Sequence, residues 1–555
     1  MSDVTEPREQ PVLDVVVIGA GFAGLYLVHR LRESGFSLRA FETGSDVGGT
    51  WFWNRYPGAR CDVESLHYSY FFDDALVNEW EWSEKFAAQP EILRYINWVA
   101  DRLELRPEFT FDTRVDAAVF DEIDSTWLIR TDTGESVRAH HIVSAAGALS
   151  ASSVPSFPGQ DDYRGRIVHT GAWPDGLDLS GQRVAVIGTG SSGIQSIPEI
   201  AKKAGNVTVF QRTPNFTLPA RNRPLYRDEI IESRRRIDEI RTITRNSPTA
   251  MPRIRGHQRA DEVPAERRRE MFELEWKRGG VGLLALFNDL ATNLEANELA
   301  ADFVREKIRT IVENNATADA LTPKGYPIGA RRIALDTDYY ATFNLPHVDL
   351  IDTVTEPLVG FTPDGIATKD GSYEFDTVVL ATGFDGMTGP LTRMDIRGRD
   401  GISLAAAWRN GPRNYLGLAV AGFPNLFTIT GPGSPSVLVN VVRAIEQHVD
   451  WIVDCLVALR SLGVDEIEAD VTAQDEWVAI VNDIAQGTLY VKANSWYLGS
   501  NIEGKPRVFL PYAGGLAAYR DACDAVAADG YRGFRLHRSP VSSQLPTDAI
   551  GAQNA

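Results

Sequence analysis

The sequence predicts an α/β protein built around two nucleotide-binding units, and two similar stretches support this prediction. Residues 13–31 and 183–210 each begin with a short run rich in β-branched residues and continue through G-x-G-x-x-G into an apolar-periodic segment. A buried strand, a glycine turn and a helix in this order start a Rossmann-like, dinucleotide-binding domain. Residues 221–325 are rich in Arg and Glu at helical spacing, which predicts a helical insertion in the second unit.

The composition limits the class of protein and its partners. The chain has 555 residues, enough for two to four domains, and a formal net charge of -19. This acidic balance argues against nucleic acid or an anionic membrane as a partner, because both favour basic surfaces. No apolar run approaches the roughly 20 residues of a membrane span, and the start of the chain does not resemble a signal peptide. We expect a soluble, cytoplasmic monomer or weak homo-oligomer.

The three cysteines, Cys61, Cys455 and Cys523, include no close pair. This spacing excludes a disulfide framework and a CxxC redox or zinc site, so we expect no metal. A reducing compartment fits the same observation.

The glycines of the first unit have separate physical tasks. Gly19 allows the tight turn, Gly21 lets a pyrophosphate approach the backbone, and Gly24 lets the helix pack closely on the strand. The helix start offers free N–H groups to the phosphates. Glu42 ends the next predicted strand about 20 residues on, where an acid accepts hydrogen bonds from a ribose diol. The alternative for Glu42 is a solvated strand end.

The second unit differs from the first at the position of that acid. Here the sequence reads Arg212 followed by Thr213. An arginine suits a 2′-phosphate, so the residues predict NADP rather than NAD, with a surface charge as the alternative. Further contacts are expected from the glycine loop and the helix start, at Thr189, Gly190, Ser191, Ser192, Gly193 and Gln195.

The stretch from Tyr163 to Asp175 comes just before the second unit and has an unusual composition for a linker. A flexible linker is rich in Gly, Ser or charge, whereas this one holds His169, Trp173 and Pro174. The residues alone leave two interpretations open. The stretch couples the two nucleotide sites, or it is a packing segment with Trp173 as its apolar anchor.

Two motifs resemble those of type I Baeyer–Villiger monooxygenases, in particular the phenylacetone, steroid and cyclohexanone monooxygenase group. Residues 48–62 meet every fixed position of GGxWxxxx(F/Y)PGxxxD. The linker matches the family fingerprint FxGxxxHxxx(W)(P/D), with Tyr in place of Phe at its first position. The fingerprint residues are Tyr163, Gly165, His169, Trp173 and Pro174.

This resemblance extends from Asp14 to about Gly533 and implies a fold of the flavoprotein-reductase type, with FAD at the first site and NADP at the second. The expected domains are residues 1–147 for the first part of the FAD domain and 148–384 for the NADP domain. The range 385–555 then forms the second part of the FAD domain, with a disordered tail after about residue 538.

The resemblance also implies roles for single residues. Arg332 is the expected catalytic arginine, Asp62 holds it in place, and Arg331 is a second contact to the 2′-phosphate. Trp496, on a mobile loop, is expected at the nicotinamide ribose. The expected substrate pocket contains Val437, Leu438 and Val439. Beyond Gly19, Gly21, Gly24 and Glu42, the expected FAD contacts are Gly49, Thr50, Trp51, Asp62, Tyr68 and Val115.

The implied reaction is an NADPH- and O2-dependent insertion of oxygen beside a ketone carbonyl, through a C4a-peroxyflavin, giving an ester or lactone. A permanently charged guanidinium at Arg332 would keep the peroxide deprotonated and stabilise the developing oxyanion. A flavin-containing N- or S-monooxygenase shares both glycine loops, but Asp62 and Arg332 disfavour it. A disulfide reductase needs a cysteine pair, and a non-catalytic nucleotide-binding protein would not need Arg332.

Overall fold

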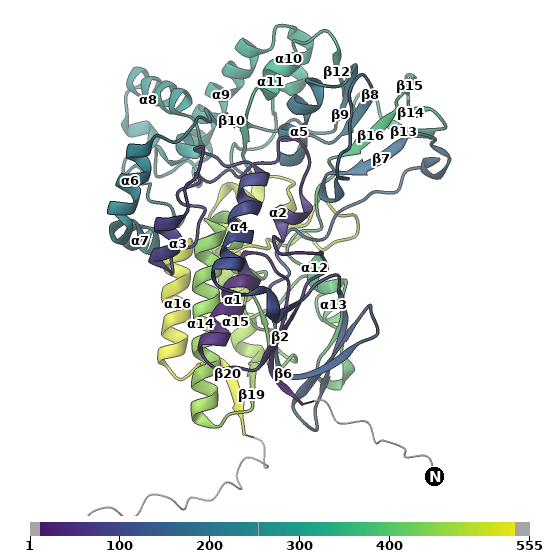
Figure 1. Ribbon diagram of the computed structural model, residues 1–555. Helices are drawn as coiled ribbons and strands as arrows, with labels where there is room; N and C mark the ends of the chain where they lie inside the picture. Colours follow the sequence, from purple (N-terminus) through teal and green to yellow (C-terminus); the bar gives the residue numbers. More distant parts are fainter. Residues whose placement is uncertain (1–10, 254, 539–555) are drawn as a thin grey trace, which may run out of the picture.

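The computed structural model describes residues 11–253 and 255–538 and is built on two sheets, an eight-stranded one below and a five-stranded one above (Figure 1). The larger sheet has the order β17-β4-β5-β6-β1-β2-β3, and β18 also pairs with β6. Its strands are β1 (Leu13–Ile18), β2 (Leu38–Phe41), β3 (Phe109–Thr110), β4 (Val115–Asp121), β5 (Thr126–Thr131), β6 (Ser136–Ser144), β17 (Asp395–Arg397) and β18 (Leu426–Thr428). Two distant parts of the chain therefore build this sheet.

The strand β1 lies inside the sheet, parallel to β2 and β6, and is buried on both faces. Val15 and Val17 pack beneath α1 (Phe22–Glu33) and α14 (Val441–Leu462), whereas Val16 packs toward β4 and β5. A parallel strand covered on both faces requires such an unbroken apolar run.

The smaller sheet has the order β12-β9-β8-β16-β7, with all strands parallel. Its strands are β7 (Arg166–His169), β8 (Arg183–Ile187), β9 (Asn206–Gln211), β12 (Val348–Asp352) and β16 (Thr377–Leu380). At its edge β7 pairs with β16, so that His169 lies opposite Leu380. The stretch that we expected to connect the two units thus supplies an edge strand of the second unit, with Val168 buried in it.

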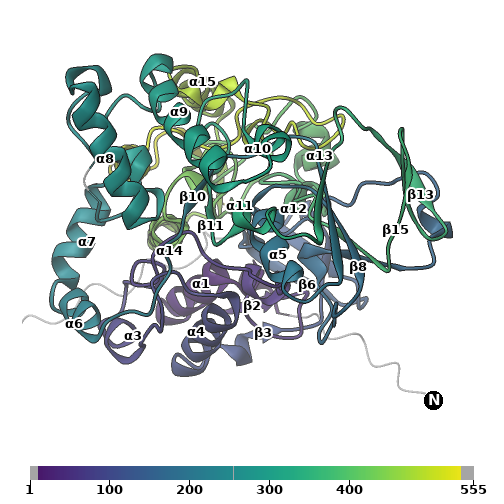
Figure 2. The same cartoon turned by 90° about the horizontal axis from the view of Figure 1, so that it is seen from above.

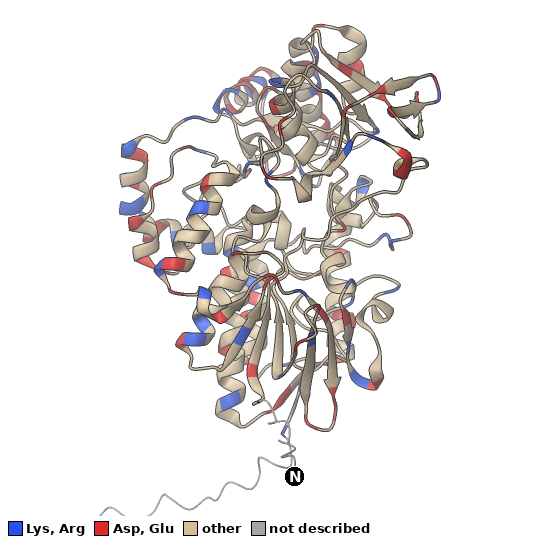
Figure 3. Ribbon diagram, turned by 45° about the vertical axis from the view of Figure 1, so that its right-hand side comes forward, with Lys and Arg blue, Asp and Glu red and all other residues tan. Residues whose placement is uncertain are grey.

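The inserted region after residue 221 is helical, as the sequence predicts. Its helices are α6 (Arg227–Arg235), α7 (Ile237–Asn246), α8 (Ala265–Arg278), α9 (Leu294–Ile311) and α10 (Asn315–Leu321). Figures 1 and 2 show α6, α7 and α8 to one side of both sheets, and Figure 3 shows charged residues spaced along the outer helices. Ion pairs such as Lys307–Glu273 (2.8 Å) join α9 to α8 across these charged faces.

Two short parallel strands, β10 (Thr217–Pro219) and β11 (Ala334–Asp336), pair where the insertion leaves and rejoins the second unit. Arg331 and Arg332 come directly before β11, so this pairing fixes the segment that carries them. The other helices are α2 (Thr50–Trp53), α3 (Asp74–Glu79), α4 (Gln89–Arg102), α5 (Ser191–Ala201), α11 (Tyr339–Thr342), α12 (Gly389–Thr392), α13 (Leu404–Ala407), α15 (Val471–Gln486) and α16 (Leu516–Ala528). A three-stranded antiparallel sheet contains β13 (Leu358–Thr362), β14 (Gly365–Thr368) and β15 (Ser372–Glu374).

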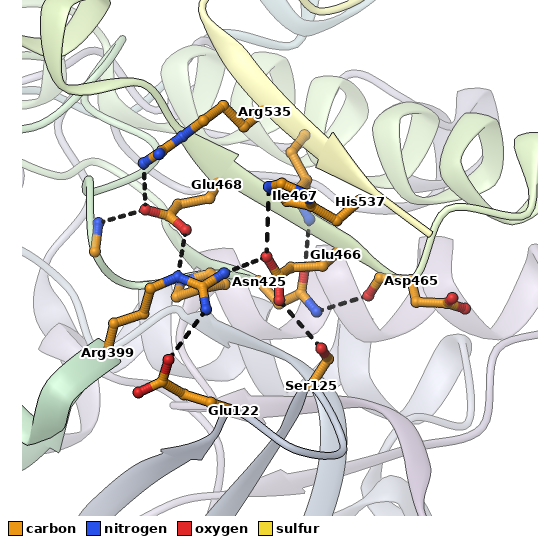
Figure 4. Close-up of polar contacts among 12 residues, drawn as sticks. Glu122, Ser125, Arg399, Asn425, Asp465, Glu466, Ile467, Glu468, Arg535 and His537 are labelled. Carbon is orange, nitrogen blue, oxygen red and sulfur yellow. Dashed lines mark hydrogen bonds and ion pairs between the residues drawn. The ribbon is translucent and has the colours of Figure 1, made fainter. Parts of the chain in front are cut away.

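A charge cluster ties the two-stranded antiparallel sheet of β19 (Glu466–Ala469) and β20 (Phe534–His537) to the rest of the chain (Figure 4). Arg399 donates to Glu468 at 2.7 Å, pairs with Glu466, and reaches Glu122 at 3.4 Å. Glu466 and Glu468 are 5% and 3% exposed. One guanidinium thus pairs with two buried carboxylates, of which Glu468 also pairs with Arg535, and it joins this two-stranded sheet to the turn between β4 and β5.

Within the described ranges, no helix has the length and apolar character that crossing a membrane requires. The tail after residue 538, predicted to be disordered, lies outside the described residues.

Candidate active site

The first glycine loop has no room for side chains at its critical positions. A Cβ on Gly24 would lie 1.8 Å from the carbonyl oxygen of Gly19. A Cβ on Gly49, whose φ is +52°, would lie 2.8 Å from Cα of Gly21. The loop and the following glycine motif therefore meet backbone to backbone before the N-terminus of α1, a geometry that fits a dinucleotide pyrophosphate.

Glu42 is tethered to this loop. It is 6% exposed, and its carboxylate accepts hydrogen bonds from the N–H groups of Ala20 (2.7 Å) and Gly44 (2.7 Å). Burial raises the pKa of Glu42, while these backbone hydrogen bonds oppose the shift. The alternative of a solvated strand end is wrong, because the carboxylate lies against the glycine loop, where a ribose diol is expected.

Aromatic residues line the first site. The indole N–H of Trp51 donates to the hydroxyl of Tyr68 (3.2 Å), and burial raises the pKa of Tyr68 well above its usual value. Thr50 begins α2 and is exposed. Val115 lies at the start of β4, 3% exposed, in the core on the other face of the sheet. The structure brings Trp51 and Tyr68 together and places Val115 apart from them.

The second glycine loop repeats the geometry of the first. A Cβ on Gly193 would lie 2.2 Å from the carbonyl oxygen of Gly188, whereas a Cβ on Gly190 would meet nothing within 4 Å. The hydroxyl of Thr189 donates to the carbonyl of Thr213 (3.1 Å). This bond joins the glycine loop to the segment at the end of β9, and the open space beside Gly190 suits the approach of a phosphate.

Gln195, which we expected to contact the nucleotide, joins the two units through its side chain. Its side chain accepts a hydrogen bond from the hydroxyl of Tyr56 (2.8 Å) and donates to the carbonyl of Arg60 (2.9 Å). A Cβ on Gly58 would lie 2.2 Å from the Gln195 carbonyl oxygen. Burial raises the pKa of Tyr56 to about 12, opposed by a hydrogen bond with Ser192. The loop of the first unit therefore docks on the first turns of α5, where Ser191 and Ser192 also lie.

Two arginines form a cationic site beside the second loop. The guanidinium of Arg331 lies over the ring of Tyr326, 4.8 Å from its centroid. Burial lowers the pKa of Arg331, Tyr326 opposes this shift, and the charge of Arg212 adds to it. The buried Nε of Arg331 has no hydrogen-bond partner among the described residues. Neighbouring cations with an unpartnered buried donor fit a doubly charged anion such as a 2′-phosphate.

Arg332 and Asp62 form a bidentate ion pair. Nε of Arg332 donates to one carboxylate oxygen of Asp62 (2.9 Å) and its terminal nitrogen to the other (2.8 Å). The remaining terminal nitrogen donates to the carbonyl of Val437 (2.7 Å). The charge of Asp62 raises the pKa of Arg332. Burial raises the pKa of the nearby Tyr497, and the charge of Arg332 opposes that rise. The guanidinium is thus fixed in orientation and permanently charged.

The expected pocket residues divide between two cores. Val437 and Leu438 pack in one apolar cluster with Trp496, whose ring centroid lies 4.6 Å from that of Tyr497. Val439 packs instead against the core of the first sheet. Sequence reasoning missed Tyr497, for which the only signal was its position next to Trp496.

The fingerprint residues support each other within the second unit. The hydroxyl of Tyr163 donates to the carbonyl of Phe375 (2.9 Å), and a Cβ on Gly165 would lie 2.3 Å from that hydroxyl. Nδ1 of His169 accepts a hydrogen bond from the N–H of Gly171 (3.0 Å). Burial lowers the pKa of His169, so its imidazole is neutral at pH 7.

The end of the fingerprint also reaches the first unit. Trp173 packs against the core of the second unit, while Pro174 is exposed. The next residue, Asp175, accepts two hydrogen bonds from Arg55, at 2.8 and 2.9 Å. This stretch therefore packs within one unit and contacts the other, and its coupling of the two nucleotide sites stays a prediction.

The fold and site define a flavoprotein oxidoreductase with two dinucleotide sites, and comparisons with known proteins agree. Residues 16–266 match the family model described as pyridine nucleotide-disulphide oxidoreductase. The chain is 44% identical to a Baeyer–Villiger monooxygenase of Pseudooceanicola batsensis, over 93% of this chain and 95% of that protein. It is 42% identical to the phenazine N-monooxygenase PhzNO1 of Lysobacter antibioticus, over 95% of this chain and 98% of that protein.

A solved structure of an oxidized steroid monooxygenase bound to NADP superposes with a TM-score of 0.91 and 49% identity, covering 95% of this chain and 100% of that one. The chain therefore belongs to the family of Baeyer–Villiger monooxygenases. These enzymes use FAD, NADPH and O2 to insert one oxygen atom beside a ketone carbonyl.

Proposed function

We propose that Arg332, held by Asp62, is the catalytic group of this monooxygenase, and that its substrates are bulky cyclic, aryl or steroid ketones. The main support is the bidentate ion pair between these two residues, together with the hydrogen bond that Arg332 donates to the carbonyl of Val437. This arrangement places a fixed positive charge beside the loop that carries the three expected pocket residues, Val437, Leu438 and Val439.

The chemistry of oxygen transfer is supplied by FAD when it is bound. The chain's own residues position the reacting groups and stabilise the charge that develops on them. Arg332 cannot act as a proton donor near neutral pH, so it contributes charge to a developing oxyanion rather than acid catalysis. Asp62 keeps the guanidinium plane in one orientation, and the apolar cluster around Trp496 limits the access of water.

Arg212 and Arg331 hold the 2′-phosphate of NADP in this proposal. Replacing Arg212 with alanine is expected to raise KM for NADPH by about tenfold or more, which corresponds to about 1.4 kcal/mol of lost binding. KM for NADH should change little, because NADH has no 2′-phosphate. Steady-state kinetics with both nucleotides measure this, and an equal change in the two KM values would remove the phosphate argument.

The proposed substrate class rests on the side chains near Arg332. Val437, Leu438 and Trp496 are apolar and pack together, which favours a substrate with a large apolar body. NADPH oxidation and product analysis over matched cyclic, linear, aryl and steroid ketones test this. The bulky ketones should give ester at the highest kcat/KM, and a clear preference for short linear ketones would contradict the proposal.

Nitrogen oxidation is a second candidate activity, which the similarity to a phenazine N-monooxygenase favours. An aromatic N-heterocycle belongs in the same assay, followed by mass analysis for an N-oxide. We further propose a cytoplasmic monomer or weak homo-oligomer, with FAD-domain parts 1–147 and 385–555 flanking an NADP domain of residues 148–384.

A further inference from the structure

Two segments carry the chain between the two sheets, and they pair with each other. Residues 148–153 follow β6 of the larger sheet, and residues 383–387 follow β16 of the smaller one. We call this pair of segments the crossing. Its three backbone hydrogen bonds run from Ser153 N–H to Gly383 O (2.9 Å), Asp385 N–H to Ala151 O (2.8 Å) and Met387 N–H to Ala148 O (2.7 Å). If one sheet moves relative to the other, the backbone of these residues must change conformation.

The loop that carries Trp496 is fastened to the crossing by a shielded ion pair. Nζ of Lys505 donates to a carboxylate oxygen of Asp385 (2.6 Å) and to the carbonyl of Gly386 (2.9 Å). The side chains of Lys505 and Asp385 are only 11% and 18% exposed. A shielded ammonium that loses its carboxylate is costly, so this pair holds the loop where Asp385 lies.

The indole of Trp496 lies against the crossing itself. A Cβ on Gly386 would be 3.0 Å from Cε3 of Trp496, so the indole packs on bare backbone. The loop, its tryptophan and the returning segment therefore form one contact surface beside the apolar cluster of the active site.

The same segment is held from its other side by the family fingerprint. Nδ2 of Asn501, from the loop, donates to the carbonyl of Phe384 (2.7 Å). The ring of Phe384 stands edge-on to the ring of His169, with centroids 5.9 Å apart. A Cβ on Gly171 would lie 2.9 Å from that phenyl ring. Phe384 is thus fixed between the loop and the fingerprint.

We propose that Lys505, Asp385 and Asn501 are positioning residues that latch the Trp496 loop to the crossing, so that the loop moves together with the NADP domain. The latch keeps Trp496 over the bound nicotinamide nucleotide. It thereby retains NADP through the reaction and limits the loss of oxygen as hydrogen peroxide. This inference rests on the proposed function and on the expected place of Trp496 at the nicotinamide ribose.

The test compares Lys505→Met with wild-type holoenzyme. Trypsin cleavage after the exposed Arg507, followed by mass spectrometry with saturating NADP+, should become several-fold faster, since the loop detaches more often. The dissociation constant of NADP+ should rise about tenfold, equivalent to about 1.4 kcal/mol. The fraction of oxidised NADPH that yields peroxide should rise in parallel.

Lys492→Met is the matched control, because Lys492 is an exposed lysine four residues before Trp496. It should leave cleavage, NADP+ affinity and the peroxide fraction unchanged. Asn501→Ala removes only the bond to Phe384, and it replaces Lys505→Met if that variant fails to fold. This variant should also raise the cleavage rate, the dissociation constant of NADP+ and the peroxide fraction, but by smaller factors.

Unchanged cleavage in Lys505→Met would overturn the latch, and faster cleavage with unchanged NADP+ affinity would overturn its role in positioning Trp496. Failure of the proposed function would look different. The wild type would then form no ester from any ketone, while the cleavage comparison would still be readable.

Discussion

Replacing Arg332 with alanine is expected to abolish ester formation, while FAD stays bound and NADPH is still slowly oxidised. Loss of a single oxyanion donor costs about 10²- to 10³-fold in rate, and Arg332 also carries the only charge bound to Asp62 in the described residues. Product analysis by gas chromatography, together with NADPH and peroxide assays, separates loss of oxygen transfer from loss of flavin reduction.

Two further variants control this experiment. In the double variant Arg332→Met/Asp62→Asn no carboxylate is left without a partner, so the fold should not be destabilised by an unpaired charge. A loss of activity in this variant therefore reports on catalysis rather than on unfolding. Arg331→Ala removes the neighbouring arginine and should still form ester at saturating NADPH, because its proposed partner is the 2′-phosphate. Ester formation at the normal rate in Arg332→Ala would show that the catalytic assignment is wrong.

Replacing Arg399 with methionine is expected to lower the free energy of unfolding of the part of the chain that contains the eight-stranded sheet by about 3–5 kcal/mol, the usual result of breaking a buried ion pair from one side. The change leaves Glu466 and Glu468, both nearly fully buried, without the guanidinium that joins them. Glu468 keeps Arg535 at 2.7 Å, whereas Glu466 keeps a hydrogen bond from Ser125 at 3.1 Å. Urea and thermal unfolding of the holoenzyme measure the loss.

Arg397→Met is the matched control for Arg399. Its ion pair with Asp395 is about half exposed on both sides, at 47% and 48%, and exposed pairs contribute about 0–1 kcal/mol. The control should therefore unfold close to the wild type. If both variants unfolded at the same midpoint, the charge cluster would not hold the two-stranded sheet of β19 and β20.

The features that the sequence predicted best are those set by neighbouring residues. Gly24 and Gly193 could be assigned because a strand, a turn and a helix leave no space for a Cβ there. Asp62 and Arg332 lie 270 residues apart, and only their motif contexts suggested that they meet. The position of Val439 in another core could not be predicted, because a single residue step after Leu438 turns its side chain away.

The contacts between the two units could not be predicted from the sequence. Gln195 pairs with Tyr56 across 139 positions and Lys505 with Asp385 across 120, and neither residue type is unusual in its local segment. The edge strand β7 was hidden by the Pro and Trp that follow it, which made the stretch resemble a connector. Tertiary packing, rather than local preference, decides each of these cases.

The interrupted order of the strands has a consequence for how the protein is made. The five-stranded sheet is complete once residue 380 has been synthesised, whereas the eight-stranded sheet still lacks β17 and β18. A nascent chain leaving the ribosome can therefore assemble its nicotinamide half first. The carboxyl half of β6 remains a bare strand edge until residues 426–428 emerge. We therefore expect FAD to bind only after residues 426–428 have been synthesised, and a chain that ends before them to be prone to aggregation.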